Sequence, residues 1–177
     1  DVRDLQAAGG TAITVTEGAT AAGSVLRYRL LALGIVIAGI VLDQVTKTLA
    51  IANLDPQQPI PLLGGLLTLR LIRNPGAAFS LGEELTVVLT CIAIAALVAV
   101  SGWLLPRVRH VGWAVATGLL LAGIVGNLLD RLFREPGPFR GHVIDFLQLP
   151  YFAIFNVADI CIKAAAVLVI WLSLITQ

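Results

Sequence analysis

Four long apolar segments follow one another along the chain, and two long polar connections and one very short one separate them. The segments cover about residues 28–51, 85–105, 111–132 and 153–175. An α-helix rises about 1.5 Å per residue, so about 20 apolar residues cross the roughly 30 Å hydrocarbon core of a bilayer. The pattern therefore predicts an all-α membrane protein with four transmembrane helices.

The connection over about residues 52–84 is too long for a simple loop. Within it, Thr68 and Arg70 alternate with leucines in LLTLRLIRN, which is typical of a short strand. Proline and glycine residues punctuate the stretch before this strand. We expect a small extracytoplasmic β-cradle here. The connection over about 133–152 contains REPGPFRG, which indicates a turn-rich surface segment.

Composition agrees with a membrane protein. Of 177 residues, 58% are hydrophobic and 13% are charged, whereas water-soluble domains carry about 25% charged residues. Residues 1–26 are rich in Gly, Ala and Thr and are predicted to form a flexible cytoplasmic tail, followed by a single four-helix domain over 27–177. The net charge of +1 and the absence of a long basic run give no support for nucleic-acid binding.

Basic residues suggest how the chain crosses the membrane. Arg27 and Arg29 precede the first helix, and Arg107 and Arg109 lie in the very short connection between the second and third helices. Both groups lie on the same side of a four-helix chain, and positive residues favour the cytoplasmic side. The long connections also carry arginines, but these are scattered and several lie beside acids or polar motifs. We therefore predict cytoplasmic termini.

Ionisable residues within membrane segments are rare and are functional candidates. Here they form three clusters, each about one turn from the outer end of a helix: DQVTK with Asp43 and Lys47, GNLLDR with Asn127, Asp130 and Arg131, and FNVAD with Asn156 and Asp159. Their common depth predicts one shared polar pocket. The alternative is a set of separate structural pairs, in which Asp43 is paired with Lys47 and Asp130 with Arg131.

Asp145 and Asp159 lack an adjacent base, although Lys163 could reach Asp159 from one turn away. In one continuous helix the two acids would be about 21 Å apart. Pro150 lies between them and favours a break, after an extended or partly helical entry and before a helix start near Ala153 or Ile154. The acids could then face each other, share a proton and act as base and acid on a water molecule. From spacing alone, Asp130 remains a rival for the place of Asp145.

The motifs together resemble those of one family, the lipoprotein signal peptidases, also called type II signal peptidases. The matching stretches, in the family's order, are DQVTK (43–47), RNPGAAFS (73–80), GNLLDR (126–131), HVIDF (142–146) and FNVAD (155–159). The resemblance implies a multi-pass aspartic endopeptidase of the bacterial plasma membrane, with its site near the outer face. It would remove signal peptides from prolipoproteins, cutting before a cysteine that carries diacylglycerol.

The resemblance also assigns roles to residues. It implies that Asp145 and Asp159 are catalytic, that Asp43 and Lys47 support the site, and that the remaining matching positions shape the site or hold the substrate: Asn74, Asn127, Asp130, Arg131 and Asn156. Gly76, with Ala77 and Ala78, would let loop backbone approach a substrate, or else simply pack tightly.

The sequence also indicates partners and leaves two rival functions open. Membrane lipids and a globomycin-type cyclic peptide inhibitor are expected partners, with neither cofactor nor metal, because His110 and His142 have no ligand spacing. The rival functions are a proton- or ion-coupled small transporter and a noncatalytic lipoprotein-binding protein. Against a transporter, the polar residues gather at one membrane face.

Overall fold

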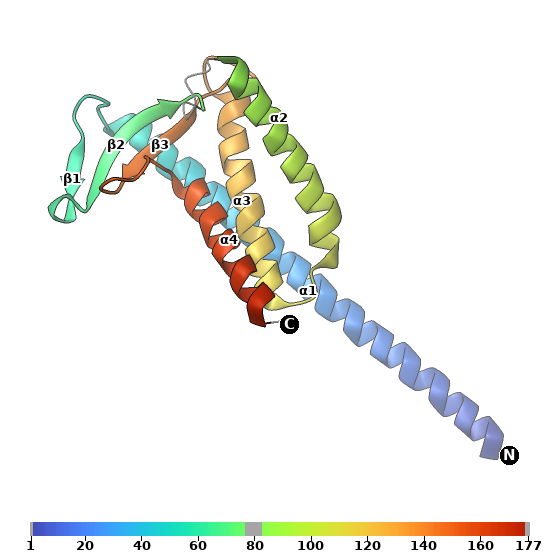
Figure 1. Ribbon diagram of the computed structural model, residues 1–177. Helices are drawn as coiled ribbons and strands as arrows, with labels where there is room; N and C mark the ends of the chain where they lie inside the picture. The colour runs from blue at the N-terminus through green and yellow to red at the C-terminus, as the bar shows by residue number, and fades with distance from the viewer. Residues whose placement is uncertain (1, 77–82, 176–177) are drawn as a thin grey trace.

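The protein is a bundle of membrane-length helices with a small sheet beside one end, as a computed structural model that describes residues 2–76 and 83–175 shows (Figure 1). The helices are α1 (Val2–Asn53), α2 (Glu83–Ala99), α3 (Val111–Phe133) and α4 (Val157–Ile175). After α2 the chain continues as a π-helical turn, η3 (Val100–Leu104), and a 3-10 turn, η4 (Leu105–Arg107). Within the described residues, four helical stretches are long and apolar enough to cross a membrane: Gly23–Asn53, Leu85–Arg107, Val111–Phe133 and Val157–Ile175.

The N-terminal segment, predicted as a flexible tail over 1–26, is helical. The structure continues α1 back to Val2, and this part of the helix extends away from the bundle (Figure 1). Helix can continue here because Pro56 is the first proline of the chain and alanine, a strong helix former, is frequent before it.

Small residues let the helices pack closely. A Cβ at Gly39 of α1 would lie 2.6 Å from Ala122 Cβ of α3, and a Cβ at Gly118 of α3 would lie 2.9 Å from the Ala32 carbonyl oxygen. Helices in lipid associate through such close approach of backbones. Large apolar side chains point outward instead, as Ile37 (55% exposed) and Leu174 (71% exposed) do. This arrangement is what a hydrocarbon solvent favours.

The sheet has three antiparallel strands in the order β1-β2-β3: β1 (Ile60–Leu62), β2 (Leu67–Asn74) and β3 (Val143–Gln148). The strand predicted in LLTLRLIRN is confirmed as β2. Sequence reasoning did not identify its pairing with β3, in which Ile72 lies opposite Asp145. β3 therefore attaches Asp145 to the sheet rather than to a helix. A 3-10 turn, η1 (Leu63–Gly65), joins β1 to β2.

The segment between β3 and α4 bends as Pro150 predicted. A turn follows β3, and Phe155 then pairs with Leu147 in an isolated bridge, so the chain folds back on the strand. The predicted helix start at Ala153 or Ile154 is wrong, because α4 begins at Val157. Asn156 accounts for the later start: its Oδ1 accepts the Asp159 N–H at 3.0 Å, and Asp159 Oδ2 accepts the Asn156 N–H at 3.3 Å. This reciprocal pair is a capping box.

Candidate active site

Asn156 links the two acids that the sequence singled out. Its Nδ2 donates to Asp145 Oδ1 at 2.7 Å, while its Oδ1 and N–H form the cap with Asp159. Asp145 comes from β3 and Asp159 from the first turn of α4, so the bend at residues 149–155 brings together acids fourteen positions apart. Asp145 and Asp159 thus share Asn156 as a hydrogen-bond partner, and their predicted action as a pair stays a prediction.

Neutral amides supply the other hydrogen bonds to these acids. Asn74 at the end of β2 donates to Asp145 Oδ2 at 2.9 Å, and Asn127 of α3 donates to Asp159 Oδ1 at 2.9 Å. Among the side chains that the structure describes, those of residues 23–76 and 85–175, no Lys or Arg nitrogen lies within 4.0 Å of either carboxylate. The hydrogen bonds therefore orient the two carboxylates, but no direct ion pair with a described side chain neutralises their negative charge.

The environment of Asp145 favours its protonated form. The residue is 3% exposed. Burial raises the pKa of Asp145 to about 6; the hydrogen bond from Asn74 acts in the opposite direction, and the nearby charge of Asp159 raises the pKa further. Two carboxyl groups in this relation can hold one proton between them near neutral pH.

A second, ionised network lies beside this pair and is centred on Lys47. The Lys47 ammonium lies 2.8 Å from Asp43 Oδ2, 2.7 Å from Asp130 Oδ2 and 3.1 Å from Asn127 Oδ1. Lys47, Asp43 and Asp130 are all completely buried. The predicted pairing of Asp43 with Lys47 is confirmed, and the network joins it to the other clusters in one polar centre.

The acids of this second network hold the backbone next to the first pair. Asp130 Oδ2 accepts the N–H of Ile144, the residue before Asp145, at 3.2 Å. Asp43 Oδ1 accepts the N–H of Ala158, the residue before Asp159, at 2.8 Å. Lys47 thus connects two carboxylates, each of which fixes the chain one residue away from an acid of the Asp145–Asp159 pair.

Asp130 has a different partner from the one expected. Arg134 Nε, one helical turn further along, lies 2.6 Å from Asp130 Oδ1, and Arg134 Nη2 donates to Gln44 Oε1 at 3.3 Å. The pairing with Arg131 is wrong because adjacent helix positions face different directions, whereas positions four apart share a face. That spacing was the signal by which Arg134 could have been found. Lys47 and Arg134 thus both form ion pairs with Asp130.

The structure also positions Arg131 and Gly76, two other predicted site residues. Arg131 Nη1 is buried without a hydrogen-bond partner among the described residues, and its guanidinium lies within electrostatic range of Asp145 and Asp159. Gly76 has a φ of +105°, donates its N–H to Asn74 Oδ1 at 2.8 Å, and has no room for a Cβ, which would lie 2.5 Å from Leu89 Cδ1 of α2. Gly76 thus packs tightly and helps to fix Asn74, while residues 77 and 78 lie outside the described residues.

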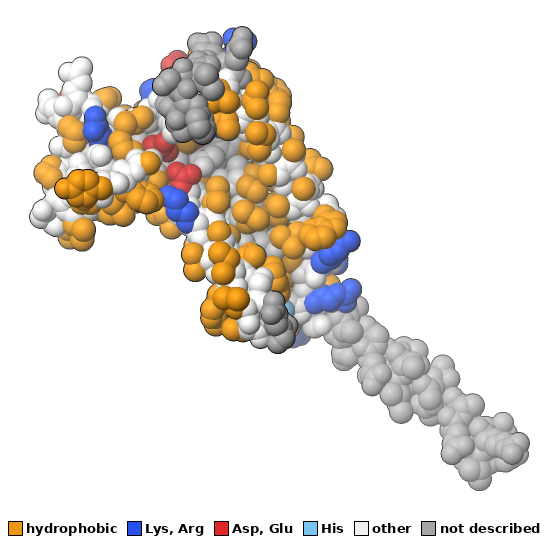
Figure 2. All heavy atoms as spheres, viewed as in Figure 1, with side chains coloured by type: hydrophobic (Ala, Val, Ile, Leu, Met, Phe, Trp, Pro, Cys, Tyr) orange, Lys and Arg blue, Asp and Glu red, His pale blue; other side chains and the backbone are white. Residues whose placement is uncertain are grey.

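Lys163 does not reach Asp159. Its ammonium lies over the rings of Phe152 and Phe155, 4.7 and 5.0 Å from their centroids. Figure 2 shows the resulting surface: acidic side chains are visible in a recess between the sheet and the helices, with a basic group below them. Among the described residues no group of three or more His, Cys, Asp or Glu side chains could hold a metal ion. The recess therefore offers paired carboxyl groups, amide donors and a free guanidinium.

Comparison with known proteins places this chain in a family. A family model described as signal peptidase (SPase) II matches residues 35–175. The lipoprotein signal peptidase of Mycobacterium avium is 46% identical over 148 residues, which cover 84% of this chain and 80% of that protein. The lipoprotein signal peptidase of Mycobacterium tuberculosis is 42% identical over 168 residues, 92% of this chain and 82% of that protein. A bacterial membrane enzyme solved by the in meso method has a TM-score of 0.72 at 26% identity, over 81% of this chain and 92% of that one. The chain belongs to the signal peptidase II family.

Proposed function

We propose that this signal peptidase II removes signal peptides from lipid-modified prolipoproteins, with Asp145 and Asp159 as the catalytic pair. One observation carries the assignment. Among the four buried or half-buried acids at the site, Asp43 and Asp130 bind Lys47, whereas Asp145 and Asp159 receive only amide donors. An acid that must exchange a proton in each turnover cannot be held ionised by a buried cation.

The environments of the two acids indicate which of them carries the shared proton. Because burial raises the pKa of Asp145 to about 6, we assign the shared proton to Asp145 and the role of base to Asp159. Asp159 takes a proton from a water molecule as its oxygen attacks the scissile carbonyl carbon. The protonated carboxyl group of Asp145 donates a hydrogen bond to the carbonyl oxygen as negative charge develops on that oxygen. As the C–N bond breaks, the proton on Asp159 passes to the leaving amine.

Arg131 and the asparagines have binding roles in this proposal. The buried Nη1 of Arg131, unpartnered among the described residues, can donate to a substrate carbonyl in the recess. Asn74 and Asn127 keep one orientation of each acid through the hydrogen bonds described above. A buried donor that lacks a partner in the free enzyme gains one when a peptide backbone binds, which favours binding at this position.

The substrate class follows from family membership. Its known members are lipoprotein signal peptidases, and the resemblance implies cleavage before a diacylglyceryl cysteine. A site at one end of the helices, beside the sheet, meets such a bond where the lipid anchor holds it. A cyclic peptide of the globomycin type would occupy the same recess and compete with the substrate.

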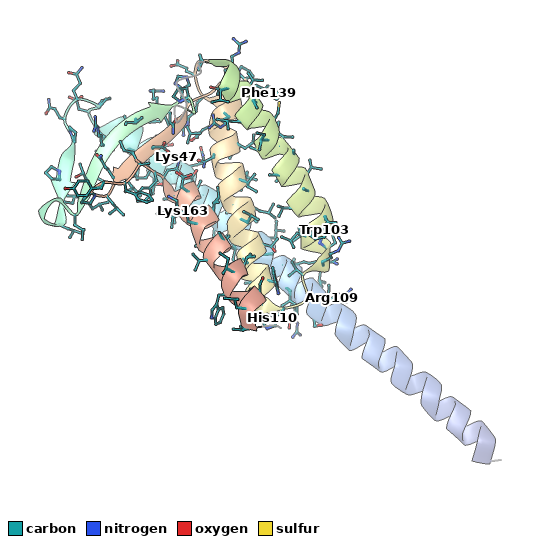
Figure 3. The ribbon with its side chains drawn as sticks, in the orientation of Figure 1. Lys47, Trp103, Arg109, His110, Phe139 and Lys163 are labelled. Atoms are coloured by element: carbon teal, nitrogen blue, oxygen red, sulfur yellow. The ribbon has the colours of Figure 1, made fainter. Side chains whose placement is uncertain are left out.

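The orientation we propose places both termini in the cytoplasm and the site near the outer face of the bacterial plasma membrane. Arg29 donates to the Pro106 carbonyl at 2.7 Å. The basic residues at the start of the first span and those between α2 and α3 therefore lie at one end of the bundle. Figure 3 shows Arg109 at this end, away from the sheet. Of the arginines at the other end, Arg134 is engaged by Asp130 and so contributes little to the positive-inside balance.

The test is cleavage of a lipidated prolipoprotein by the purified protein in lipid nanodiscs. Asp145→Asn and Asp159→Asn, each made alone, are expected to lower kcat by about 10²–10⁴-fold or more, because each removes one proton-transfer group. Asp55→Asn is the matched control, since Asp55 is an exposed loop aspartate, and it should cleave like wild type. Wild-type cleavage by either dyad variant would refute the catalytic assignment, and no cleavage by the unmodified enzyme would refute the function.

A further inference from the structure

A second recess lies on the side of α4, outside the proteolytic site. It has a volume of about 560 Å³, within the range of about 300–1,000 Å³ typical of ligand pockets. Ile160, Ala164, Val167 and Trp171 line it from α4, and Phe152 and Phe155 close it toward the sheet. Because all six are apolar and side chains along α4 are exposed, this groove is open to the hydrocarbon of a surrounding bilayer.

Among the described residues that line this groove, Lys163 alone is charged. Its side chain is exposed and its ammonium is held over Phe152 and Phe155, whose rings stand edge to face with centroids 5.8 Å apart. Figure 3 places Lys163 on the flank of α4 below the sheet. Lysine side chains in membrane helices extend in this way toward the headgroup level. The charge is therefore fixed at the end of the groove nearest the sheet.

Lys163 has no counter-ion among the side chains that the structure describes. In residues 23–76 and 85–175, no carboxylate oxygen lies within 4.0 Å of Lys163 Nζ. Two aromatic rings stabilise an ammonium only in part and accept none of its three N–H donors in a conventional hydrogen bond. An anionic oxygen at the same level would provide both charge and acceptors.

The groove also has the length that a lipid chain requires. From Val157, where α4 begins beside the sheet, to Trp171 the helix advances fourteen residues, or about 21 Å. The groove therefore follows α4 past the middle of the roughly 30 Å hydrocarbon core. We propose that the groove binds one anionic phospholipid of the leaflet on the sheet side. Its phosphate accepts hydrogen bonds from Lys163, and one of its acyl chains lies along α4 as far as Trp171. The site is distinct from peptide hydrolysis and does not depend on the catalytic assignment.

Trp171 provides a reporter at the far end of the groove. In protein with Trp103→Phe and Trp113→Phe, the remaining fluorescence comes from Trp171, and brominated acyl chains quench tryptophan on contact. The protein is placed in phosphatidylcholine bilayers that contain a small mole fraction of either brominated phosphatidylglycerol or brominated phosphatidylcholine. The ratio of the two quenching effects measures the local enrichment of the anionic lipid.

We expect an enrichment of about fivefold, the contribution of one basic residue at a membrane surface. Lys163→Gln should lower the ratio to about one, and Lys163→Arg should keep it. Arg70→Gln is the matched control, because Arg70 is an exposed cation on the sheet that does not line the groove, and it should keep the ratio. A ratio near one in the parent protein, or one unchanged by Lys163→Gln, would overturn the proposal. Quenching of Trp171 only by a brominated diacylglyceryl peptide would also overturn it and assign the groove to the substrate.

Discussion

Replacing Lys47 by methionine should test the ionised network most directly. The substitution keeps the length of the side chain and removes a completely buried ammonium that lies 2.8 Å from Asp43, 2.7 Å from Asp130 and 3.1 Å from Asn127. Arg134 remains beside Asp130, but Asp43 loses its cation. Removing one partner of a buried ion pair typically costs about 3–5 kcal/mol, because a charge is left uncompensated. We expect the free energy of unfolding to fall by about that amount.

The same substitution should also lower activity, through the backbone. Asp43 and Asp130 accept the N–H groups of the residues that precede Asp159 and Asp145. When Lys47 is absent, the two carboxylates repel each other or take up protons, and these anchors weaken. We expect a lower kcat, because the dyad would no longer be held in the productive geometry.

Unfolding of purified protein, followed by helix content during denaturant titration in detergent, measures the loss of stability, and cleavage of a lipidated prolipoprotein measures the loss of activity. Lys163→Met is the matched control, since Lys163 is exposed, and in detergent it should change stability by less than about 0.5 kcal/mol. Adding Asp43→Asn to Lys47→Met removes the orphaned charge, so the double variant should be more stable than Lys47→Met alone. If Lys47→Met matched wild type in both measurements, the supporting role of the network would be refuted.

Two further predictions concern the dyad and the helix contacts. For the dyad, kcat/KM should fall as pH rises through about 6, where Asp145 loses its proton. Asn74→Ala should move this fall to higher pH, because it removes a hydrogen bond that favours the ionised form of Asp145. A fall that stayed in place or moved to lower pH would contradict the assignment to Asp145. For the helices, Gly123→Ala should lower the thermal midpoint of unfolding, because its Cβ would lie 2.5 Å from the backbone oxygen of Ala158 in α4. Gly34→Ala, where nothing lies within 4 Å of the added Cβ, should leave the midpoint unchanged, and equal midpoints for the two variants would contradict the close-packing argument.

Much of the architecture follows from local patterns in the sequence. Apolar run lengths predicted four membrane helices, because the thickness of a bilayer sets the number of residues that a span needs. Alternation in LLTLRLIRN predicted β2, and Pro150 predicted the bend before α4. The common depth of the polar clusters predicted one shared pocket. The helices, the strand and the bend each rest on a pattern read within about twenty residues, and the shared pocket adds to them only the alternating direction of the spans.

What the tertiary structure decided depends on contacts between distant segments. The sequence left Asp130 as a rival of Asp145, and only the three-dimensional contacts showed Asp130 bound to Lys47 and Arg134. Strand register between β2 and β3 placed Asp145 beside Asn74, and aromatic rings before α4 drew Lys163 away from Asp159. The sequence alone determines that the charged residues in its apolar segments need partners, because an isolated ion is costly in a medium of low dielectric constant. Which partner each charge obtains is decided by the packing of the helices and the register of the sheet. In Asp130, one oxygen binds Arg134 of the next helical turn and the other binds Lys47 of a distant helix.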